Sequence, residues 1–98
     1  NNSINLQKGG SPNKKQLYLF KAEWCPHCVA FKPIWSALEK KYENHIEMNV
    51  YDSDKNGKKI KEWKINGFPT IIMKNGNKAI EYAGPRTIDD MVDFIEKN

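Results

Sequence analysis

The sequence predicts an α/β fold, built as a four-stranded mixed sheet with helices on both faces. Two observations predict it. Short apolar runs alternate with segments whose apolar residues recur at helical spacing, which gives the order β-α-β-α-β-β-α. An Asn-Gly pair separates the last two strand-like runs and predicts a hairpin, so parallel and antiparallel strands share the sheet. At 98 residues, the chain is expected to form one domain.

The beginning of the chain is polar, and Gly and Pro interrupt it. This composition predicts a flexible arm over residues 1–16, with a candidate edge strand at residues 4–6. The folded domain is expected over residues 17–98. Its first strand is predicted at residues 17–21, because this run is short, apolar and rich in aromatic side chains.

A helix is predicted from residue 26 to about residue 42. Pro26 suits its first position, where a backbone N–H has no helical partner. Pro33 lies inside the helix and is expected to kink it, because proline lacks the N–H that the helix needs there. The face turned to the core is expected to carry Phe31, Ile34, Trp35, Leu38 and Tyr42.

The next two elements are predicted from alternation and from capping residues. Residues 45–51 alternate apolar and polar side chains, which predicts a second strand. Asp52 or Ser53 is expected to cap a short helix over residues 58–64 with a side-chain oxygen. One turn apart on that helix lie Ile60 and Trp63.

The last third of the chain predicts a hairpin followed by a helix. Strands are expected at residues 69–74 and 78–82, with Asn75-Gly76 as the turn because both residues tolerate positive φ. Thr87 is expected to cap the final helix. The inner stripe of that helix should hold Ile88, Met91, Val92 and Ile95.

Composition and charge narrow the function classes. Hydrophobic residues make up 39% and charged residues 29%, as in an ordinary globular domain, and no stretch approaches the ~18 apolar residues of a membrane span. The formal net charge is +4, but every basic residue except Arg86 is a lysine, whereas nucleic-acid sites favour clustered arginine. We therefore expect a monomer with no cofactor, no nucleic-acid partner and no membrane span in these residues.

The first residue bears on the cellular location of the protein, and the number of cysteines limits the kinds of cysteine site that it can form. The chain begins at Asn1 rather than at a methionine. The expected location is cytoplasmic if the chain is complete, and secretory or membrane-anchored if an upstream segment is missing. Two cysteines are too few for a disulfide framework and, by themselves, for a four-thiolate zinc site.

Both cysteines lie in the segment Trp24-Cys25-Pro26-His27-Cys28, between the first strand and the first helix. A Cys-x-x-Cys spacing after a strand and at the start of a helix, in a β-α-β pattern, is typical of a redox site. The free N–H groups and the dipole of the helix N-terminus favour a thiolate. We therefore expect Cys25 to be an exposed nucleophile of low pKa and Cys28 to be a buried resolving thiol.

Other interpretations of the cysteine pair stay open on spacing alone. The pair could be half of a zinc or iron–sulfur site, completed by another subunit, since His27 and His45 are the only histidines. It could also be two core cysteines, or the remnant of a site in a binding module. Pro26 and His27 between the cysteines are poor core residues, which disfavours the core interpretation.

The chain resembles the thioredoxin fold family over about residues 17–97. Several motifs occur in the family's order: AEWCPHC, a proline inside the helix, an aspartate after the second strand, GFPT, and YAGPR before the last helix. These motifs lie at residues 22–28, Pro33, Asp52, residues 67–70 and residues 82–86. The closing segment looks most like the catalytic domains of protein disulfide isomerases, and CPHC looks like the motif of bacterial periplasmic oxidases.

The resemblance implies a thioredoxin-like fold and thiol–disulfide exchange with protein or peptide substrates, supported by a redox donor or acceptor of unknown identity. Pro69 would be a cis-proline facing the cysteines, and together with Phe68 it would pair with an extended substrate backbone. Trp24 would be an exposed platform beside the nucleophile, and Gly84 would leave the groove open.

The dipeptide between the cysteines bears on the direction of the reaction. Pro26 and His27 are expected to tune the thiolate, because a charge or hydrogen bond from His27 would stabilise the reduced form. The disulfide would then be relatively oxidising. An oxidase, an isomerase and a cytosolic reductase all remain open.

The sequence departs from the family where members usually bury a carboxylate beneath the second cysteine. That position is Leu19 here, and the lysine that often accompanies it falls at about Met48. Glu23 is a doubtful substitute by strand alternation. The sequence therefore predicts no internal base for Cys28.

Overall fold

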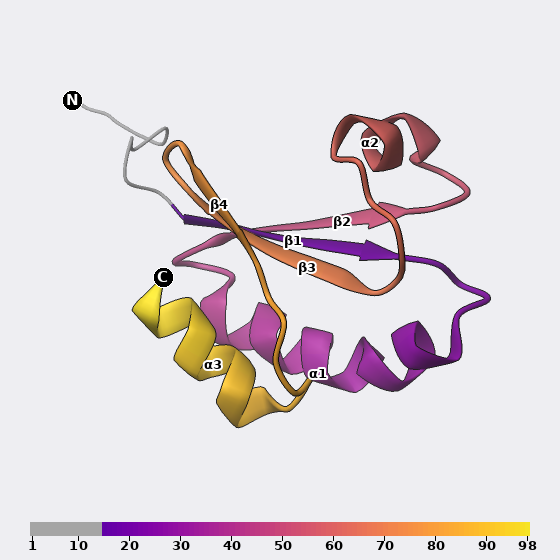
Figure 1. Cartoon of the computed structure of the whole chain (residues 1–98). Helices are drawn as coiled ribbons and strands as arrows, with labels where there is room; N and C mark the ends of the chain where they lie inside the picture. The colour runs from indigo at the N-terminus through magenta and orange to yellow at the C-terminus, as the bar shows by residue number, and fades with distance from the viewer. Residues whose placement is uncertain (1–14) are drawn as a thin grey trace.

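The computed structural model describes residues 15–98, which form a mixed β-sheet covered by helices on both faces (Figure 1). Within these residues the sheet has four strands in the order β2-β1-β3-β4. β1 pairs in parallel with β2 and antiparallel with β3, which is antiparallel to β4. The elements are β1 (Lys15–Lys21), α1 (Pro26–Tyr42), β2 (Glu47–Asp52), α2 (Gly57–Glu62), β3 (Thr70–Asn75), β4 (Lys78–Glu81) and α3 (Ile88–Lys97).

The expected fold class is confirmed, and strand alternation explains its two layers. In β1, Leu17 and Leu19 point to one face and join the larger core beneath α1 and α3. Tyr18 and Phe20 point to the other face and pack under α2. Figure 1 shows α1 and α3 on one side of the sheet and α2 on the other. The central strand is therefore buried on both faces, in agreement with its unbroken apolar run.

The predicted strands differ from the observed ones mainly at their ends. β1 takes in Lys15 and Gln16, which were expected to belong to the arm, because both pair with β2 or β3. The edge strand expected at residues 4–6 lies outside the described residues. β2 begins at Glu47, after the backbone N–H groups of His45 and Ile46 donate to the Tyr42 carbonyl at the end of α1.

The hairpin turn lies one residue later than the sequence predicted. Asn75 pairs with Lys78, so the turn residues are Gly76 and Asn77. Gly76 has a φ of 64°, whereas Asn77 has no positive φ. A glycine in the first central position favours a type II′ turn, so only one of the two turn residues needs the left-handed region.

The predicted cap of α3 is confirmed, and the predicted cap of α2 is wrong. Thr87 caps α3 as expected, since its side chain accepts the backbone N–H of Asp90 at 3.1 Å. Neither Asp52 nor Ser53 caps α2, because the Asp52 carboxylate accepts the backbone N–H groups of Asp54 and Lys55 instead. The helix begins at Gly57 after Asn56, which makes no side-chain cap bond.

Two expected core positions are exposed. Ile88 is 43% exposed at the start of α3, and Val50 is 38% exposed on the edge strand β2. Both belong to apolar patterns predicted from the sequence, Ile88 at the first residue of α3 and Val50 in the alternating run of the edge strand. No helix within residues 15–98 combines the length and the apolar character needed to cross a membrane.

Candidate active site

The two cysteines lie where the carboxyl end of β1 meets the start of α1, at the right of Figure 1. Cys25 is the residue before the helix, with extended backbone angles (φ −91°, ψ 117°), and Pro26 follows in the first turn. The Cys25 carbonyl accepts the N–H groups of Cys28 (3.0 Å) and Val29 (3.1 Å). Chain direction thus places the Cys25 thiol at the end of the helix where N–H groups are free.

Cys25 is more buried than expected. Only 7% of the residue is exposed, and 5% of Cys28. Ala22 completes a small buried cluster with the two cysteines, and the Phe68 ring packs against it. The Cys25 thiol donates a hydrogen bond to the Phe68 carbonyl at 3.4 Å. The expectation of an exposed Cys25 is therefore wrong, because the loop carrying Phe68 covers it.

The Phe68–Pro69 peptide bond is cis, as the resemblance implied. This loop leads into β3, which lies beside β1, so it reaches the cysteines from the neighbouring strand. The Trp24 side chain is 66% exposed and meets the Phe68 ring edge-on at 6.0 Å between centroids. Trp24 and Phe68, which directly precedes Pro69 in the loop, therefore form an apolar surface beside the Cys25 thiol.

The two thiols have opposite pKa shifts. A hydrogen bond from the Cys28 backbone N–H is the main cause that lowers the pKa of Cys25, and it outweighs the opposing effect of burial. The Cys28 thiol, the His27 backbone N–H and the charge of Arg86 act in the same direction. Burial raises the pKa of Cys28, although the Ala22 N–H contacts its sulfur at 3.5 Å. The expected difference in acidity between the two thiols is confirmed in direction.

Arg86 is a site residue that the sequence analysis missed. Its positive charge lowers the pKa of both thiols, although it lies some 60 positions from them in the sequence. The signal was present, since Arg86 is the chain's only arginine, but its position next to the cysteines depends on how β4 leads into α3. His27 acts on Cys25 through its backbone N–H, and the expected role of its imidazole stays a prediction.

The structure shows a packing reason for glycine at position 84. A Cβ at this position would lie 2.6 Å from the Tyr82 hydroxyl oxygen and 2.9 Å from its Cζ. The Tyr82 ring meets Phe94 of α3 edge-on at 4.9 Å, and its hydroxyl donates to the Pro85 carbonyl. The absent side chain of Gly84 therefore makes room for Tyr82. An effect of Gly84 on the substrate groove stays a prediction.

No carboxylate lies beneath Cys28 at the position the family would use. Leu19 is 5% exposed and belongs to the larger core, with Met48 packed against it. Glu23 is half exposed, and its pKa is lowered by a hydrogen bond from Lys21 and by the charge of Lys32. A carboxylate held in its charged form by two lysines is a weak proton acceptor. Glu23 is therefore a poor substitute for the family's buried carboxylate, as expected from the sequence.

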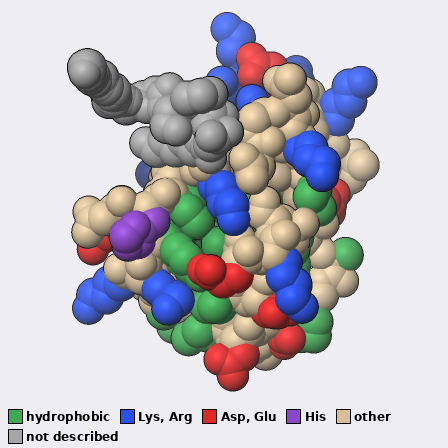
Figure 2. Space-filling model, turned by 90° about the vertical axis from the view of Figure 1, so that its left-hand side faces the viewer, with side chains coloured by type: hydrophobic (Ala, Val, Ile, Leu, Met, Phe, Trp, Pro, Cys, Tyr) green, Lys and Arg blue, Asp and Glu red, His purple; other side chains and the backbone are tan. Residues whose placement is uncertain are grey.

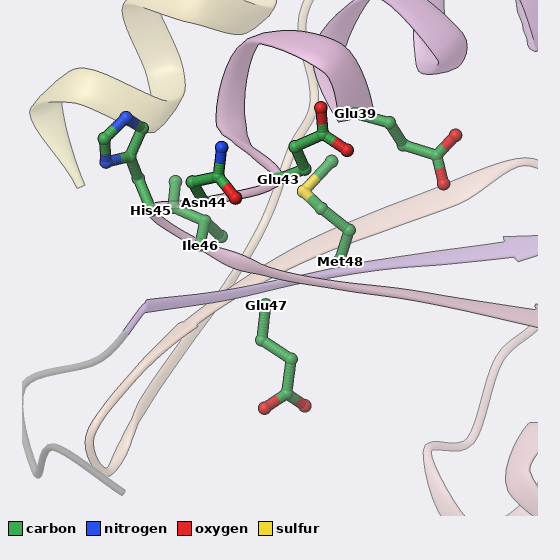
Figure 3. Close-up of a pocket in the computed structure, with 7 residues that line it drawn as sticks. All are labelled: Glu39, Glu43, Asn44, His45, Ile46, Glu47 and Met48. Carbon is green, nitrogen blue, oxygen red and sulfur yellow. The ribbon is translucent and has the colours of Figure 1, made fainter. Parts of the chain in front are cut away.

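A hollow of about 570 Å³ lies at the end of α1 that is opposite to the cysteines. Figure 3 shows its carboxylates, Glu39 and Glu43, on the helix side, and Glu47 beyond the strand. Figure 2 views this end, where apolar side chains gather among charged ones. His45 is exposed there and takes no part in the cysteine site. Within residues 15–98, no group of His, Cys, Asp and Glu could hold a metal ion.

Fold and site together define a class: an α/β domain with a Cys-x-x-Cys pair at a helix start, facing a cis-proline loop. The family model named Thioredoxin matches residues 4–97. A protein disulfide-isomerase from Drosophila melanogaster is 35% identical over 88 residues, which are 88% of this chain and 18% of that protein. Human protein disulfide-isomerase TMX3 is 35% identical over 81 residues, covering 80% of this chain and 18% of that protein.

Solved structures show the same fold. The J-Trx1 fragment of ERdj5 superposes with a TM-score of 0.80 at 17% identity, covering 87% of this chain and 43% of that one. The Drosophila melanogaster thioredoxin Deadhead has a TM-score of 0.73 at 22% identity, covering 87% of this chain and 81% of that one. The chain belongs to the thioredoxin family. It spans about a fifth of the length of the protein disulfide-isomerases it matches.

Proposed function

We propose that this domain is a thiol–disulfide oxidoreductase that exchanges disulfides with protein or peptide substrates. One observation carries the proposal: the Cys25 thiol lies at the N-terminus of α1 and contacts the carbonyl of Phe68, directly before the cis-proline. The likeness to protein disulfide-isomerases over 80% or more of the chain supports the same reaction class. Cys25 is the nucleophile, Cys28 the resolving thiol, and Trp24, Phe68 and Pro69 contact the substrate.

The reaction begins when the Cys25 thiolate attacks one sulfur of a substrate disulfide. A new sulfur–sulfur bond joins Cys25 to the substrate, the old bond breaks, and the departing substrate sulfur takes up a proton. Cys28 then loses its proton and attacks the Cys25 sulfur. This second step expels the other substrate thiolate and leaves a Cys25–Cys28 disulfide, so two electrons pass to the substrate. The reverse sequence oxidises a substrate dithiol.

The shifts of the two thiols suit these different roles. A lowered pKa gives Cys25 a larger thiolate fraction than an ordinary cysteine at the same pH, whereas a raised pKa favours the protonated form of Cys28. Stabilising the Cys25 thiolate also stabilises the reduced protein, so we propose a relatively oxidising potential. With Leu19 in place of a buried acid, the proton of Cys28 leaves to water.

Trapping of mixed disulfides tests the proposal. Cys28→Ser keeps the nucleophile but cannot resolve, so it should accumulate mixed disulfides with a reduced and denatured test protein in oxidising buffer. Cys25→Ser should accumulate almost none, because the raised pKa of its remaining thiol favours the unreactive protonated form. The double substitution is the matched control. Equal trapping by the two single variants would contradict the assigned roles, and trapping by neither would contradict the function.

The direction of the reaction is tested by the reduction potential. Equilibration with glutathione buffers of known ratio, read by differential alkylation of Cys25 and Cys28, gives the potential. We expect a value above the roughly −270 mV of thioredoxin. A value at or below that level would refute the oxidising assignment and leave a reductase.

A further inference from the structure

A small pocket lies at the start of α1, beside His27 of the Cys-x-x-Cys motif. Its volume is about 170 Å³, below the roughly 300 Å³ at which sites for whole small-molecule ligands begin. This size suits a single side chain. The pocket is lined by His27, Ala30, Phe31, Ile34 and Arg86.

The pocket has an apolar floor and a cationic rim. Phe31 is 2% exposed and Ile34 is partly buried, so the floor belongs to the larger core. Arg86 is exposed on the segment between β4 and α3, and it forms none of the ion pairs found within residues 15–98. A guanidinium beside apolar surface is less well hydrated than a lysine ammonium and can bind a carboxylate through two parallel hydrogen bonds.

Two of the lining residues place this pocket close to the reacting thiols. His27 is part of the Cys-x-x-Cys motif itself, and the charge of Arg86 lowers the pKa of both thiols. Trp24 and the Phe68–Pro69 loop form the apolar surface beside Cys25 that is described above. A polypeptide whose cysteine reaches Cys25 is therefore close to both an apolar surface and a cationic pocket.

We propose that the pocket between His27 and Arg86 is a specificity subsite that binds an acidic side chain of the substrate polypeptide, close in sequence to the reacting cysteine. The inference rests on the proposed oxidoreductase function and adds a substrate preference to it. The Arg86 guanidinium binds the carboxylate, and the apolar floor contacts the methylene groups of the acidic side chain. The sequence surrounding a cysteine then affects how fast this domain attacks it.

A peptide series tests the subsite. Each short peptide carries one cysteine joined by a disulfide to a chromogenic aryl thiol. Attack of the Cys25 thiolate on the peptide sulfur joins it to the protein and expels the coloured aryl thiolate. A single Glu is moved through the three positions on each side of the cysteine, with the Gln peptide as its neutral match. The measured quantity is the ratio of second-order rate constants, Glu over Gln.

We expect this ratio to reach about two- to fivefold at one or two positions, and to fall with added salt. Arg86→Gln should bring the ratio to one, while Arg86→Lys should retain part of it. Lys32→Gln removes a cation that pairs with Glu23 outside the pocket, so the ratio should persist in that control. Any effect of Arg86 on the thiols themselves cancels in the ratio, because both peptides meet the same thiols.

The outcomes separate the subsite from the function. A ratio of one at every position in the unchanged protein, or a ratio that survives Arg86→Gln, would overturn the subsite while the reaction itself stands. If no peptide releases its aryl thiolate, the proposed function fails before the subsite is in question.

Discussion

At the scale of single residues, a backbone N–H rather than a charged side chain is the main cause of the lowered pKa of Cys25. The strongest influence on the pKa of Cys25 is the backbone N–H of Cys28, three positions on in the first turn of α1. Arg86 adds a charge from a distant part of the chain. Cys28 lies one turn deeper, where burial dominates. One turn of helix therefore separates a thiol of lowered pKa from a thiol of raised pKa.

The pH dependence of alkylation should show the contribution of the backbone. In Cys28→Ala, only the Cys25 thiol remains and the backbone N–H of residue 28 is retained. We expect its alkylation rate to rise with pH and level off at a lower pH than for free cysteine, since the lowered pKa makes the thiolate form earlier. A stopped series of iodoacetamide reactions measures the midpoint. A midpoint at the free-cysteine value would contradict the role of the helix start.

The charge of Arg86 makes a separate contribution. Arg86→Gln removes a cation that lowers the pKa of Cys25, so the midpoint of its thiolate absorbance should move to higher pH. Arg86→Lys keeps the charge and should move it less. If both variants keep the original midpoint, then Arg86 does not act on the thiol through its charge.

At the scale of elements, the helices on the larger face are joined near their ends by a single polar contact. The Tyr42 hydroxyl, at the end of α1, donates to a carboxylate oxygen of Glu96 on α3 at 2.7 Å. The ring itself is 5% exposed. Burial and the Glu96 charge raise the pKa of Tyr42 to about 12. The neutral hydroxyl is therefore the form that the folded protein favours.

This contact predicts both a stability loss and a pH dependence. Tyr42→Phe keeps the ring but removes the hydrogen bond, which should cost about 1 kcal/mol in urea unfolding at neutral pH. Because the folded pKa is raised from 10.0, the stabilisation is fully present below about pH 10 and is lost as pH rises toward about 12. The unchanged protein should lose stability in that window, and Tyr42→Phe should lose less.

Tyr51→Phe is the matched control for this change, since the Tyr51 hydroxyl forms none of the hydrogen bonds found within residues 15–98. It should leave the free energy of unfolding nearly unchanged. Equal losses in the two variants would show that the hydrogen bond to Glu96 is not the cause.

In the connection between β4 and α3, the Tyr82 side chain lies close to the backbone of Gly84. Gly84→Ala places a methyl group against the Tyr82 ring, which Phe94 and the Pro85 carbonyl hold in position. We expect a loss of about 1 kcal/mol in urea unfolding. In a Tyr82→Ala background the same change should cost less, because the obstructing ring is gone. A cost that is equal in both backgrounds would exclude the contact as its source.

At the scale of the whole molecule, the sheet separates two apolar clusters that share the strands β1 and β3. The larger cluster lies under α1 and α3 and includes Leu38 and Trp35. The smaller one lies under α2, where Trp63 packs against Tyr18 with ring centroids 4.6 Å apart. Because the same strands line both clusters, we expect the two faces to unfold together.

Leu38→Ala tests this cooperativity. Leu38 is fully buried on α1, so its truncation should cost about 2–5 kcal/mol. In urea, tryptophan fluorescence reports on both clusters and far-ultraviolet circular dichroism reports on all elements. Both signals should shift to the same lower midpoint. Separate midpoints would show that the clusters unfold independently.

Much of the fold and part of the site could be predicted from local patterns. Apolar spacing located α1 at its observed bounds, and Thr87 identified the start of α3, because helix periodicity and capping depend on neighbours within a few residues. The hairpin turn was placed one residue early, since Asn-Gly and Gly-Asn are both favourable turn pairs and only strand register separates them. The predicted cap of α2 was wrong because the Asp52 carboxylate binds the backbone N–H groups of Asp54 and Lys55, which are closer along the chain.

The sequence by itself determined the order of elements, the fold class and the location of a Cys-x-x-Cys pair at a helix start, all of which follow from residues close along the chain. Only the tertiary structure decided that the Phe68 loop covers Cys25 and that the charge of Arg86 lowers the pKa of both thiols. It also decided that the missing side chain of Gly84 makes room for the Tyr82 ring. These features depend on contacts between β1, β3 and the segment before α3, which chain folding brings together. No local pattern encodes such contacts, because their partners lie tens of residues apart.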